Sequence, residues 1–264
     1  MATKYDRIAA DLRRKIQTGQ LGPGEQLPVE TTLKDDYNVS LLTLRRALDV
    51  LEMEGLIEKR HGHGNFVRTR RRRMRRATDR YQWEKDRALL TEAERRAPGV
   101  VERDTGLAHE DLIFEAQFES IEADADLADA FSVPVGTPLL RRSYRQQSRE
   151  EDASLVLSTS YLVLDRIAAN PDLLSAENEP WPGGTPHQLY TVGIEIDRII
   201  DEVTARPPSL DEAEALGIEA GVSLIVLRKT SIDTTGQVVE VADVLMAGDR
   251  TQLVYTTNLK RYPT

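Results

Sequence analysis

The sequence predicts an α+β protein of two domains, and three observations lead to this fold class. Its 264 residues exceed the roughly 100–200 residues that one domain usually needs. Apolar residues recur at three- and four-residue spacing over residues 5–54, whereas alternating apolar residues become frequent from about residue 100. Residues 1–80 hold 18 Lys and Arg against 11 Asp and Glu, whereas residues 81–264 hold 17 against 33. A basic end joined to an acidic body indicates that the N-terminal part meets a polyanion.

The composition excludes several classes of protein. The chain has no cysteine, which rules out a disulfide framework, Cys-based zinc sites, iron–sulfur clusters and a Cys nucleophile. No apolar run approaches the ~20 residues of a membrane helix, and the first residues lack the apolar stretch of a signal peptide. We therefore expect a cytoplasmic protein with no membrane partner, no cofactor and no bound metal.

Three helices are expected in the first 55 residues. The first covers residues 5–18, and a short second helix covers residues 30–37. Ser40 is a suitable N-cap for a third helix, because its hydroxyl can accept a hydrogen bond from an unpaired amide of the first turn. Gly55 supplies the left-handed residue that ends this helix near Glu54. The apolar stripe that faces the core consists of Leu44, Ala47, Leu48 and Leu51.

A β-hairpin is expected after these helices. Residues 56–60 and 65–68 form its strands, and the glycine-rich residues 61–64 form its turn. Three helices and a two-stranded hairpin make a winged helix-turn-helix, which we place at residues 1–68. In such folds the second helix of the turn motif enters the major groove of DNA.

The third helix carries the candidate DNA-reading side chains. Because Leu44 faces the core, Thr43, Arg46 and part of Arg45 face away from it. An arginine in this place can donate two hydrogen bonds to O6 and N7 of guanine. The alternative is that both arginines are ordinary solvated charges.

The hairpin turn carries three further candidates, His61, Gly62 and His63. Its backbone amides and imidazoles can lie beside phosphates or in the minor groove. Two imidazoles could instead bind a metal, but without a nearby cysteine a stable site lacks ligands.

Residues 69–99 are expected to be an arginine-rich linker followed by a polar helix. Seven arginines lie within residues 68–76, and helical spacing continues over residues 81–94 until Pro98 and Gly99 break the chain. The arginine run is either a solvated linker or a set of phosphate contacts that raises affinity for any DNA sequence.

Residues 100–264 are expected to form a second domain built mostly of strands. Ser209 caps one short helix, and Glu212 stands at the position of its capping-box partner. Strands joined mostly by hairpins imply a largely antiparallel sheet with peripheral helices. The expected elements are an alternating segment at 114–118, a helix at 124–131, a hairpin of 138–147 and 154–163, a strand at 194–203, a helix at 209–216, a hairpin of 222–232 and 238–246, and a strand at 253–259.

Several segments of residues 1–68 together match a known pattern: residues 8–13, the motif Leu21-Gly22-Pro23-Gly24-Glu25-Gln26-Leu27-Pro28, Ser40, and residues 43–48, 51–52, 54–57 and 62–67. In these segments the winged helix-turn-helix resembles the GntR family of bacterial transcription regulators. The resemblance implies DNA contacts by Thr43, Arg45, His61 and Gly62. Two positions depart from the family pattern: Leu41 stands where a DNA-contacting arginine is usual, and Val29 stands where a small or hydroxylic residue usually starts the helix.

The second domain also has matching segments, at residues 136–139, 158–162, 183–185, 209–213, 216–217, 221–222, 227–229, 236–240 and 248–250. In these segments, and in their order, it resembles the UTRA domain, which marks the HutC-type branch of that family. The resemblance implies a fold like chorismate lyase, a site for a small molecule, and dimerisation through this domain.

The resemblance also implies part of an effector site. Glu240 matches a pocket carboxylate, Ser158 stands where some sugar-phosphate-binding members have a second carboxylate, and Thr185 lies near a ligand-binding loop. The alternatives are that Glu240 pairs with a neighbouring cation, that Arg142 is an exposed strand charge, and that the serines only satisfy backbone groups. The candidate effector-binding residues are therefore Arg142, Tyr144, Ser158, Ser160, Thr185 and Glu240.

The orientation of Glu240 follows from the pattern around it. Glu240 alternates with Val239 and Val241, so we expect the two valines to face one layer of the core. Glu240 then faces the opposite side of the sheet, toward solvent or a cavity.

These features favour a dimeric transcription regulator that binds operator DNA and responds to a small-molecule effector, with repression as the expected mode. One alternative is an unregulated DNA-binding protein whose C-terminal domain only dimerises. Another is an enzyme with a lyase-like fold. Against the enzyme, the only histidines beyond the wing are His109 and His187, and the sequence contains no GxSxG, phosphate-loop or HExxH motif.

Overall fold

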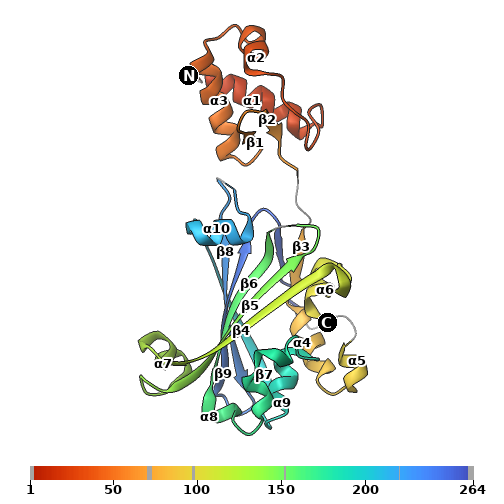
Figure 1. The fold of residues 1–264 in the computed structure, drawn as a ribbon, viewed down its shortest axis with the longest axis vertical. Helices are drawn as coiled ribbons and strands as arrows, with labels where there is room; N and C mark the ends of the chain where they lie inside the picture. The colour runs from red at the N-terminus through yellow and green to blue at the C-terminus, as the bar shows by residue number, and fades with distance from the viewer. Residues whose placement is uncertain (1–2, 70–72, 97–98, 152, 220, 261–264) are drawn as a thin grey trace. The chain divides into compact units, whose positions relative to one another are not determined.

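The computed structural model describes residues 3–69, 73–96, 99–151, 153–219 and 221–260. The chain divides into two compact units (Figure 1). One unit comprises Met1–Arg72 with Ile218–Ser223, and the other comprises Arg73–Gly217 with Leu224–Thr264. Each unit has its own hydrophobic core.

The N-terminal unit is a winged helix-turn-helix, as the sequence predicts. In a capping box at its start, Thr3 Oγ1 accepts from the Asp6 amide while the Asp6 carboxylate accepts from the Thr3 amide. Ser40 caps the third helix by accepting from the Thr43 amide at 3.2 Å, and Gly55 follows that helix with a φ of 67°. The elements are α1 (Lys4–Gln17), α2 (Glu30–Asp36), α3 (Leu41–Met53) and the antiparallel strands β1 (Ile57–Arg60) and β2 (Gly64–Val67).

Leucines from all three helices form the core of this unit. Burial of each leucine contributes on the order of 1.5–3 kcal/mol, so the inner face of α3 is firmly anchored. The outer face of α3 is thereby held in a fixed orientation. The fully or almost fully buried members of this core include Leu12, Leu33, Leu44, Leu48, Leu51, Ile57 and Val67.

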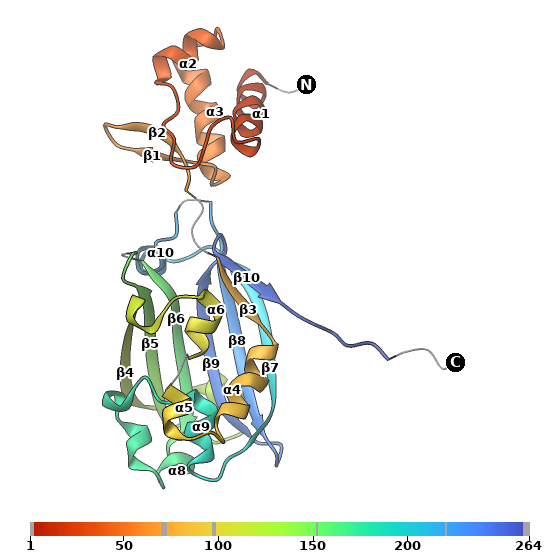
Figure 2. The ribbon, with the colours of Figure 1, turned by 90° about the vertical axis from the view of Figure 1, so that its right-hand side faces the viewer.

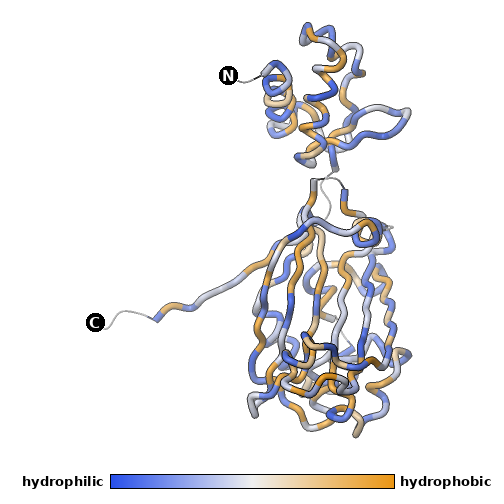
Figure 3. Tube along the Cα trace, turned by 90° about the vertical axis from the view of Figure 1, so that its left-hand side faces the viewer, coloured by the Kyte–Doolittle hydropathy of each residue, from blue (hydrophilic) through white to orange (hydrophobic). Residues whose placement is uncertain are grey.

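A six-stranded antiparallel sheet forms the centre of the C-terminal unit and confirms the predicted sheet type. Its spatial order is β4-β5-β6-β9-β8-β7, so two meanders meet where β6 pairs with β9. Hydrophobic and hydrophilic segments alternate along its strands (Figure 3). The strands are β4 (Leu112–Glu122), β5 (Pro138–Ser148), β6 (Ser154–Val163), β7 (Ile196–Arg206), β8 (Leu224–Asp233) and β9 (Val238–Ala247).

Helices lie on both faces of this sheet. On one face Leu127 and Phe131 of α7 pack against Leu139 and Val241, near one end of the strands. The opposite face, called the helix-covered face below, carries α4, α5, α6 and α9 (Figures 1 and 2). The helices are α4 (Asp79–Arg87), α5 (Glu92–Arg96), α6 (Val100–Thr105), α7 (Ala125–Phe131), α8 (Leu164–Ile167), α9 (Gly184–Tyr190) and α10 (Leu210–Leu216), with 3₁₀ turns at His109–Asp111, Pro171–Leu174 and Ala176–Asn178.

The unit also contains a second sheet that the sequence does not predict. Strand β3 (Met74–Ala77) pairs in parallel with β10 (Thr251–Val254), so the expected strand at 253–259 begins earlier and is shorter. Met74 is buried in the core with Met246. Part of the expected arginine-rich linker is therefore folded into the C-terminal unit.

The single polar helix expected over residues 81–94 is wrong, because the structure divides it. Helix α4 ends at Arg87, and α5 begins at Glu92. Thr91 Oγ1 accepts from the Glu94 amide at 3.4 Å, and the Glu94 carboxylate accepts from the Thr91 amide at 2.9 Å. This reciprocal cap starts a new helix where the periodicity suggested continuation. By contrast, the predicted capping box of Ser209 and Glu212 is present at α10. None of the helices within the described ranges is long and apolar enough to cross a membrane.

Candidate nucleic-acid interface and ligand pocket

The outer face of α3 presents the side chains that the sequence predicts to read DNA. Arg45 and Arg46 are exposed, and Thr43 is half-buried. Arg45 Nε donates to Oε2 of Glu30 on α2 at 2.8 Å, and the two side chains are 59% and 29% exposed. Such a surface ion pair contributes only ~0–1 kcal/mol. A guanine or a phosphate can therefore displace Glu30 at little cost.

Two leucines lie at the start of the same helix. Leu41 is half-buried, whereas Leu42 is 65% exposed. An exposed apolar side chain at a major-groove surface can contact a thymine methyl group. From the sequence pattern, Leu42 is only a residue outside the apolar stripe. That its side chain is exposed and free to contact DNA becomes evident only in the fold.

The wing presents the three other predicted residues. His61, Gly62 and His63 are all exposed, and Gly62 has a φ of 75°, which favours glycine. Gln26 Nε2 donates to the backbone carbonyl of His63 at 2.7 Å and ties the turn to the body of the unit. Across the described ranges, no group of three His, Cys, Asp or Glu side chains is placed to hold a metal. In the arginine run, residues 70–72 lie outside the described residues.

A cavity of about 920 Å³ lies between the sheet and the helices that cover it, within the C-terminal unit. Its volume falls within the range of small-molecule sites, roughly 300–1,000 Å³. Of the predicted effector residues, Tyr144, Ser158, Ser160, Thr185 and Glu240 line this cavity. Arg142 is fully buried and hydrogen-bonded to four of the lining residues. The structure thus brings all six residues together.

Glu240 forms the centre of a buried ionic cluster. Its Oε1 accepts from Ser160 Oγ at 2.9 Å and lies 3.3 Å from Arg142 Nη2. Its Oε2 accepts from Ser231 Oγ at 3.0 Å and lies 2.8 Å from Lys229 Nζ. Although burial alone would raise the pKa of Glu240, the charges of Lys229 and Arg142 lower it to about 2. The carboxylate is therefore ionised and already engaged by the protein.

A second carboxylate extends this network. Arg142 Nη1 donates to Gln188 Oε1 at 2.6 Å, and Gln188 Nε2 donates to Glu179 Oε1 at 2.8 Å. The same Glu179 oxygen accepts from Tyr144 Oη at 3.0 Å. Burial raises the pKa of Tyr144, so its hydroxyl remains a donor. The chain of bonds joins β5 to α9 and fixes the wall of the cavity.

The expected orientation of the valines around Glu240 is wrong. Val241 packs with Phe131 under α7, whereas Val239 packs with Leu140 and Leu189 on the other face. The pairing of β8 with β9 shifts register between Ser231 and Ile232, which leaves one extra residue at Val239. A bulge interrupts the alternation of side chains. Glu240 still faces the cavity, as predicted, but simple alternation of side chains along the strand does not explain this orientation.

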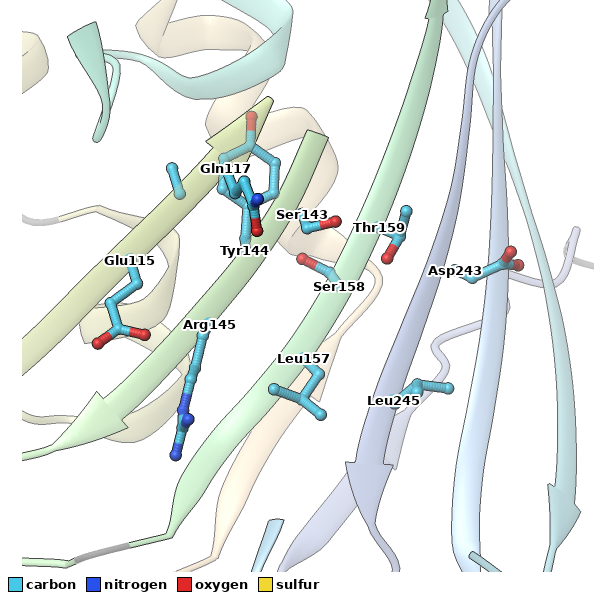
Figure 4. A pocket seen from close by; sticks show the side chains of 11 residues that line it. Glu115, Gln117, Ser143, Tyr144, Arg145, Leu157, Ser158, Thr159, Asp243 and Leu245 are labelled. Atoms are coloured by element: carbon cyan, nitrogen blue, oxygen red, sulfur yellow. The ribbon is translucent and has the colours of Figure 1, made fainter. Parts of the chain in front are cut away.

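The other face of the sheet has a hollow of its own. It has a volume of about 590 Å³ and lies among Ser143, Thr159, Asp243 and Leu245 (Figure 4). All of its lining residues belong to β4, β5, β6 and β9, so no helix closes over it. The cavity on the helix-covered face is therefore the better candidate for a site that encloses a ligand.

Several cavity residues are absent from the sequence-based candidates. Lys229 is the last residue of the family-like segment at 227–229, but its pairing with Glu240 depends on the bulge. Trp83 and Trp181, the two tryptophans of the chain, both line the cavity. Their rarity is the one sequence signal that could have singled them out. Arg76 and Arg80 also line it, from the part of the expected linker that precedes the polar helix predicted at 81–94.

A winged helix-turn-helix joined to an antiparallel sheet domain with an internal cavity defines a DNA-binding protein with a second domain suited to a small ligand. Residues 4–67 match the family model of the bacterial regulatory proteins of the gntR family, and residues 116–252 match that of the UTRA domain. The chain therefore belongs to the GntR family of transcriptional regulators, in the group that carries a UTRA domain. Its sheet domain has the chorismate-lyase-like fold of that group.

Similar proteins agree with this assignment. An HTH-type transcriptional regulator of Streptomyces coelicolor is 29% identical over 252 residues, which cover 94% of this chain and 90% of the relative. The crystal structure of a GntR-family transcriptional regulator shares 27% identity with a TM-score of 0.68 and covers 98% of both chains. The mannosyl-D-glycerate transport/metabolism system repressor MngR of Escherichia coli is 37% identical over 67 residues, 25% of this chain and 28% of that one. These relatives are regulators and not enzymes.

Proposed function

We propose that this protein is a homodimeric repressor that binds operator DNA and is released from it by a small-molecule effector. The proposal rests on one observation: a single chain carries both an exposed DNA-reading helix and a cavity of about 920 Å³ in a separate unit. The relative MngR is named a repressor, which supports repression as the mode of action.

In the N-terminal unit, Thr43, Arg45 and Arg46 read bases in the major groove, and the wing residues His61 to His63 contact the backbone or the minor groove. Two copies of the unit then bind two half-sites, as expected for a dimer of this fold.

In the C-terminal unit, the effector occupies the cavity on the helix-covered face of the sheet. The hydroxyls of Tyr144, Ser158 and Thr185 hydrogen-bond to it. Glu240 and Arg142 contribute chiefly by holding the cavity wall, because each is almost completely buried among protein partners. Since coupling between two sites is reciprocal, an effector that weakens operator binding must itself bind more weakly to the DNA-bound protein.

The test begins with selection of duplex DNA from a random pool by the full-length protein. Operator affinity is then measured by fluorescence anisotropy with and without each member of a metabolite collection, and the mass of the complex by light scattering. We expect one dimer per operator and at least one compound that raises the operator Kd. Failure to select any sequence would overturn the DNA-binding role, and a selected operator that no compound releases would favour an unregulated binder.

A further inference from the structure

A buried arginine in the cavity wall has one donor, its Nε, without a hydrogen-bond acceptor in the described part of the chain. Arg80 of α4 is 7% exposed and lines the cavity. Its Nε lies 3.3 Å from Asp104 Oδ2 but makes no hydrogen bond within the described part of the chain. A buried guanidinium carries a large desolvation cost unless its donors are matched. Asp104 balances part of the charge of Arg80, but the Nε donor still has room for an acceptor from a ligand.

A second arginine lies beside it. Arg76 of β3 donates from Nη2 to Tyr81 Oη at 3.0 Å, while its Nε is buried and makes no hydrogen bond among the described residues. The guanidinium carbons of Arg76 and Arg80 lie 5.8 Å and 5.7 Å from the centre of the Tyr81 ring. Burial, and then the charge of Arg76, lower the pKa of Arg80. Two like charges thus share one aromatic ring at one end of the cavity.

Other arginines around the cavity also have donors without acceptors. Buried Nε atoms without a hydrogen bond also belong to Arg95, which lines it, and to Arg142. Among the described lining residues, no buried side-chain oxygen lacks a partner. Glu240 and Glu179 are engaged by the network, and Asp104 pairs with Arg80. Carboxylates such as Glu84 also line the cavity, but the buried side-chain atoms without a hydrogen bond in its described wall are all arginine donors.

We infer that Arg76 and Arg80 form a subsite for an oxyanion, a phosphate or carboxylate group, of the effector. Such a group presents several acceptors to planar guanidinium donors and offsets their mutual repulsion. This inference rests on the proposed function, since it specifies the chemistry of the ligand in the same cavity.

The subsite lies close in sequence to the DNA-binding unit. Arg76 and Arg80 belong to β3 and α4, the first elements of the C-terminal unit after the segment that leads from the wing. An oxyanion held there is bound by the elements that follow the wing most closely in the chain sequence.

The test uses tryptophan fluorescence of the full-length protein, because both tryptophans line the cavity. Inorganic phosphate and malonate are titrated separately at constant ionic strength, with chloride as the reference salt. We expect a saturable change in fluorescence with at least one of the two anions. The anion with the lower Kd is then the preferred oxyanion. Arg80→Gln should weaken that binding at least tenfold, with Arg80→Lys in between, whereas the exposed Arg198→Gln on β7 should bind as the wild type does. Equal affinity of Arg80→Gln and wild type, or no saturable change with either anion, would overturn the subsite.

Folding of the variant is controlled by a second measurement. Arg80→Gln/Asp104→Asn removes both partners of the ion pair, so we expect its melting temperature without anion to equal or exceed that of the wild type. The rise in melting temperature that phosphate or malonate gives the wild type should be absent. A full anion-induced rise in this double variant would contradict the subsite.

Operator binding separates this inference from the proposed function. If the anion binds through Arg80 while operator affinity stays unchanged in its presence, the subsite is supported and effector control by that anion fails. If a compound releases operator equally well from wild type and Arg80→Gln, effector control is supported and the subsite is wrong.

Discussion

In the N-terminal unit, Arg45 pairs with Glu30 on an exposed surface, whereas in the C-terminal unit Arg142 pairs with Glu240 where their side chains are 0% and 2% exposed. Water screens the first pair and makes it easy to exchange. The second pair has lost its hydration and depends on protein partners for both charges. The same two side-chain types therefore provide a replaceable contact where DNA must bind, and a rigid framework where a cavity must keep its shape.

The largest effect is expected from removing the buried carboxylate charge. Glu240→Gln leaves Lys229 and Arg142 without their shared counter-charge, so the free energy of unfolding should fall by about 3 kcal/mol. Denaturant unfolding of wild type and variant measures this decrease. Because the cluster also shapes the cavity, effector affinity should fall in parallel. A change in unfolding free energy below about 1 kcal/mol would show that the cluster is solvated like a surface pair.

The pH dependence of stability gives an independent check of the same carboxylate. The pKa of Glu240 is about 2 in the fold and 4.5 without it, so its contribution is fully present above about pH 5. That contribution is lost as the pH falls from about 5 toward 2, because protonation of the carboxylate then favours the unfolded chain. The unfolding free energy of Glu240→Gln should fall less steeply over this range. Parallel profiles for the two proteins would contradict the lowered pKa.

The second effect should fall on DNA recognition and spare the fold. Arg45→Ala removes a predicted guanine contact, at a cost of roughly 1–3 kcal/mol for each half-site, and a dimer loses it twice. The unfolding free energy should change by less than about 1 kcal/mol, because the pair with Glu30 is exposed. Anisotropy titrations with the selected operator and denaturant unfolding measure the two quantities. Arg141→Ala, which removes a partly exposed charge of β5 that pairs with Glu119, is the control and should leave operator affinity unchanged. Wild-type operator affinity and sequence preference in Arg45→Ala would show that α3 is not the recognition helix.

The third effect concerns the arginines that precede β3. Replacement of residues 70–73 by glutamine should flatten the dependence of operator Kd on salt, because fewer counterions are released on binding. The logarithmic slope should change by about one unit for each phosphate that the variant no longer neutralises. Sequence preference should remain that of the wild type, since phosphates carry no base identity. An unaltered slope would indicate that these arginines stay in solvent.

The two units also differ in how far the sequence predicts them. In the N-terminal unit each element is defined by local signals: Ser40 starts a helix, Gly55 ends it, and a glycine-rich turn closes a hairpin. The DNA-reading face then follows from the position of Leu44 in the core. Sequence reasoning could therefore predict the exposure of Arg45 and Arg46 on α3 and of the wing residues 61–63, although it did not single out Leu42.

The cavity of the C-terminal unit depends on contacts between segments far apart in the chain. Parallel pairing of β3 with β10 joins residues near 75 to residues near 252, and four-residue strands carry no signal of their partner. The bulge at Val239 breaks the alternation that the sequence predicts for this strand. Arg80 occupies a polar helical segment, so nothing local distinguishes it from a solvated charge, yet it is buried. Resemblance to a family located Glu240 and its neighbours, but the donors around them became visible only in the fold.

The smallest effect is expected from Glu30→Gln, in the exposed ion pair of the N-terminal unit. This variant removes one carboxylate charge, as Glu240→Gln does, but it acts on a pair that water already screens. The unfolding free energy should change by less than about 1 kcal/mol. Operator affinity should rise slightly, because Arg45 is freed and one negative charge near the DNA phosphates is removed. Denaturant unfolding and anisotropy titration of Glu30→Gln measure these two quantities, for comparison with Glu240→Gln. A decrease in stability as large as that of Glu240→Gln would mean that α2 and α3 depend on this contact, and that exposure does not distinguish the two pairs.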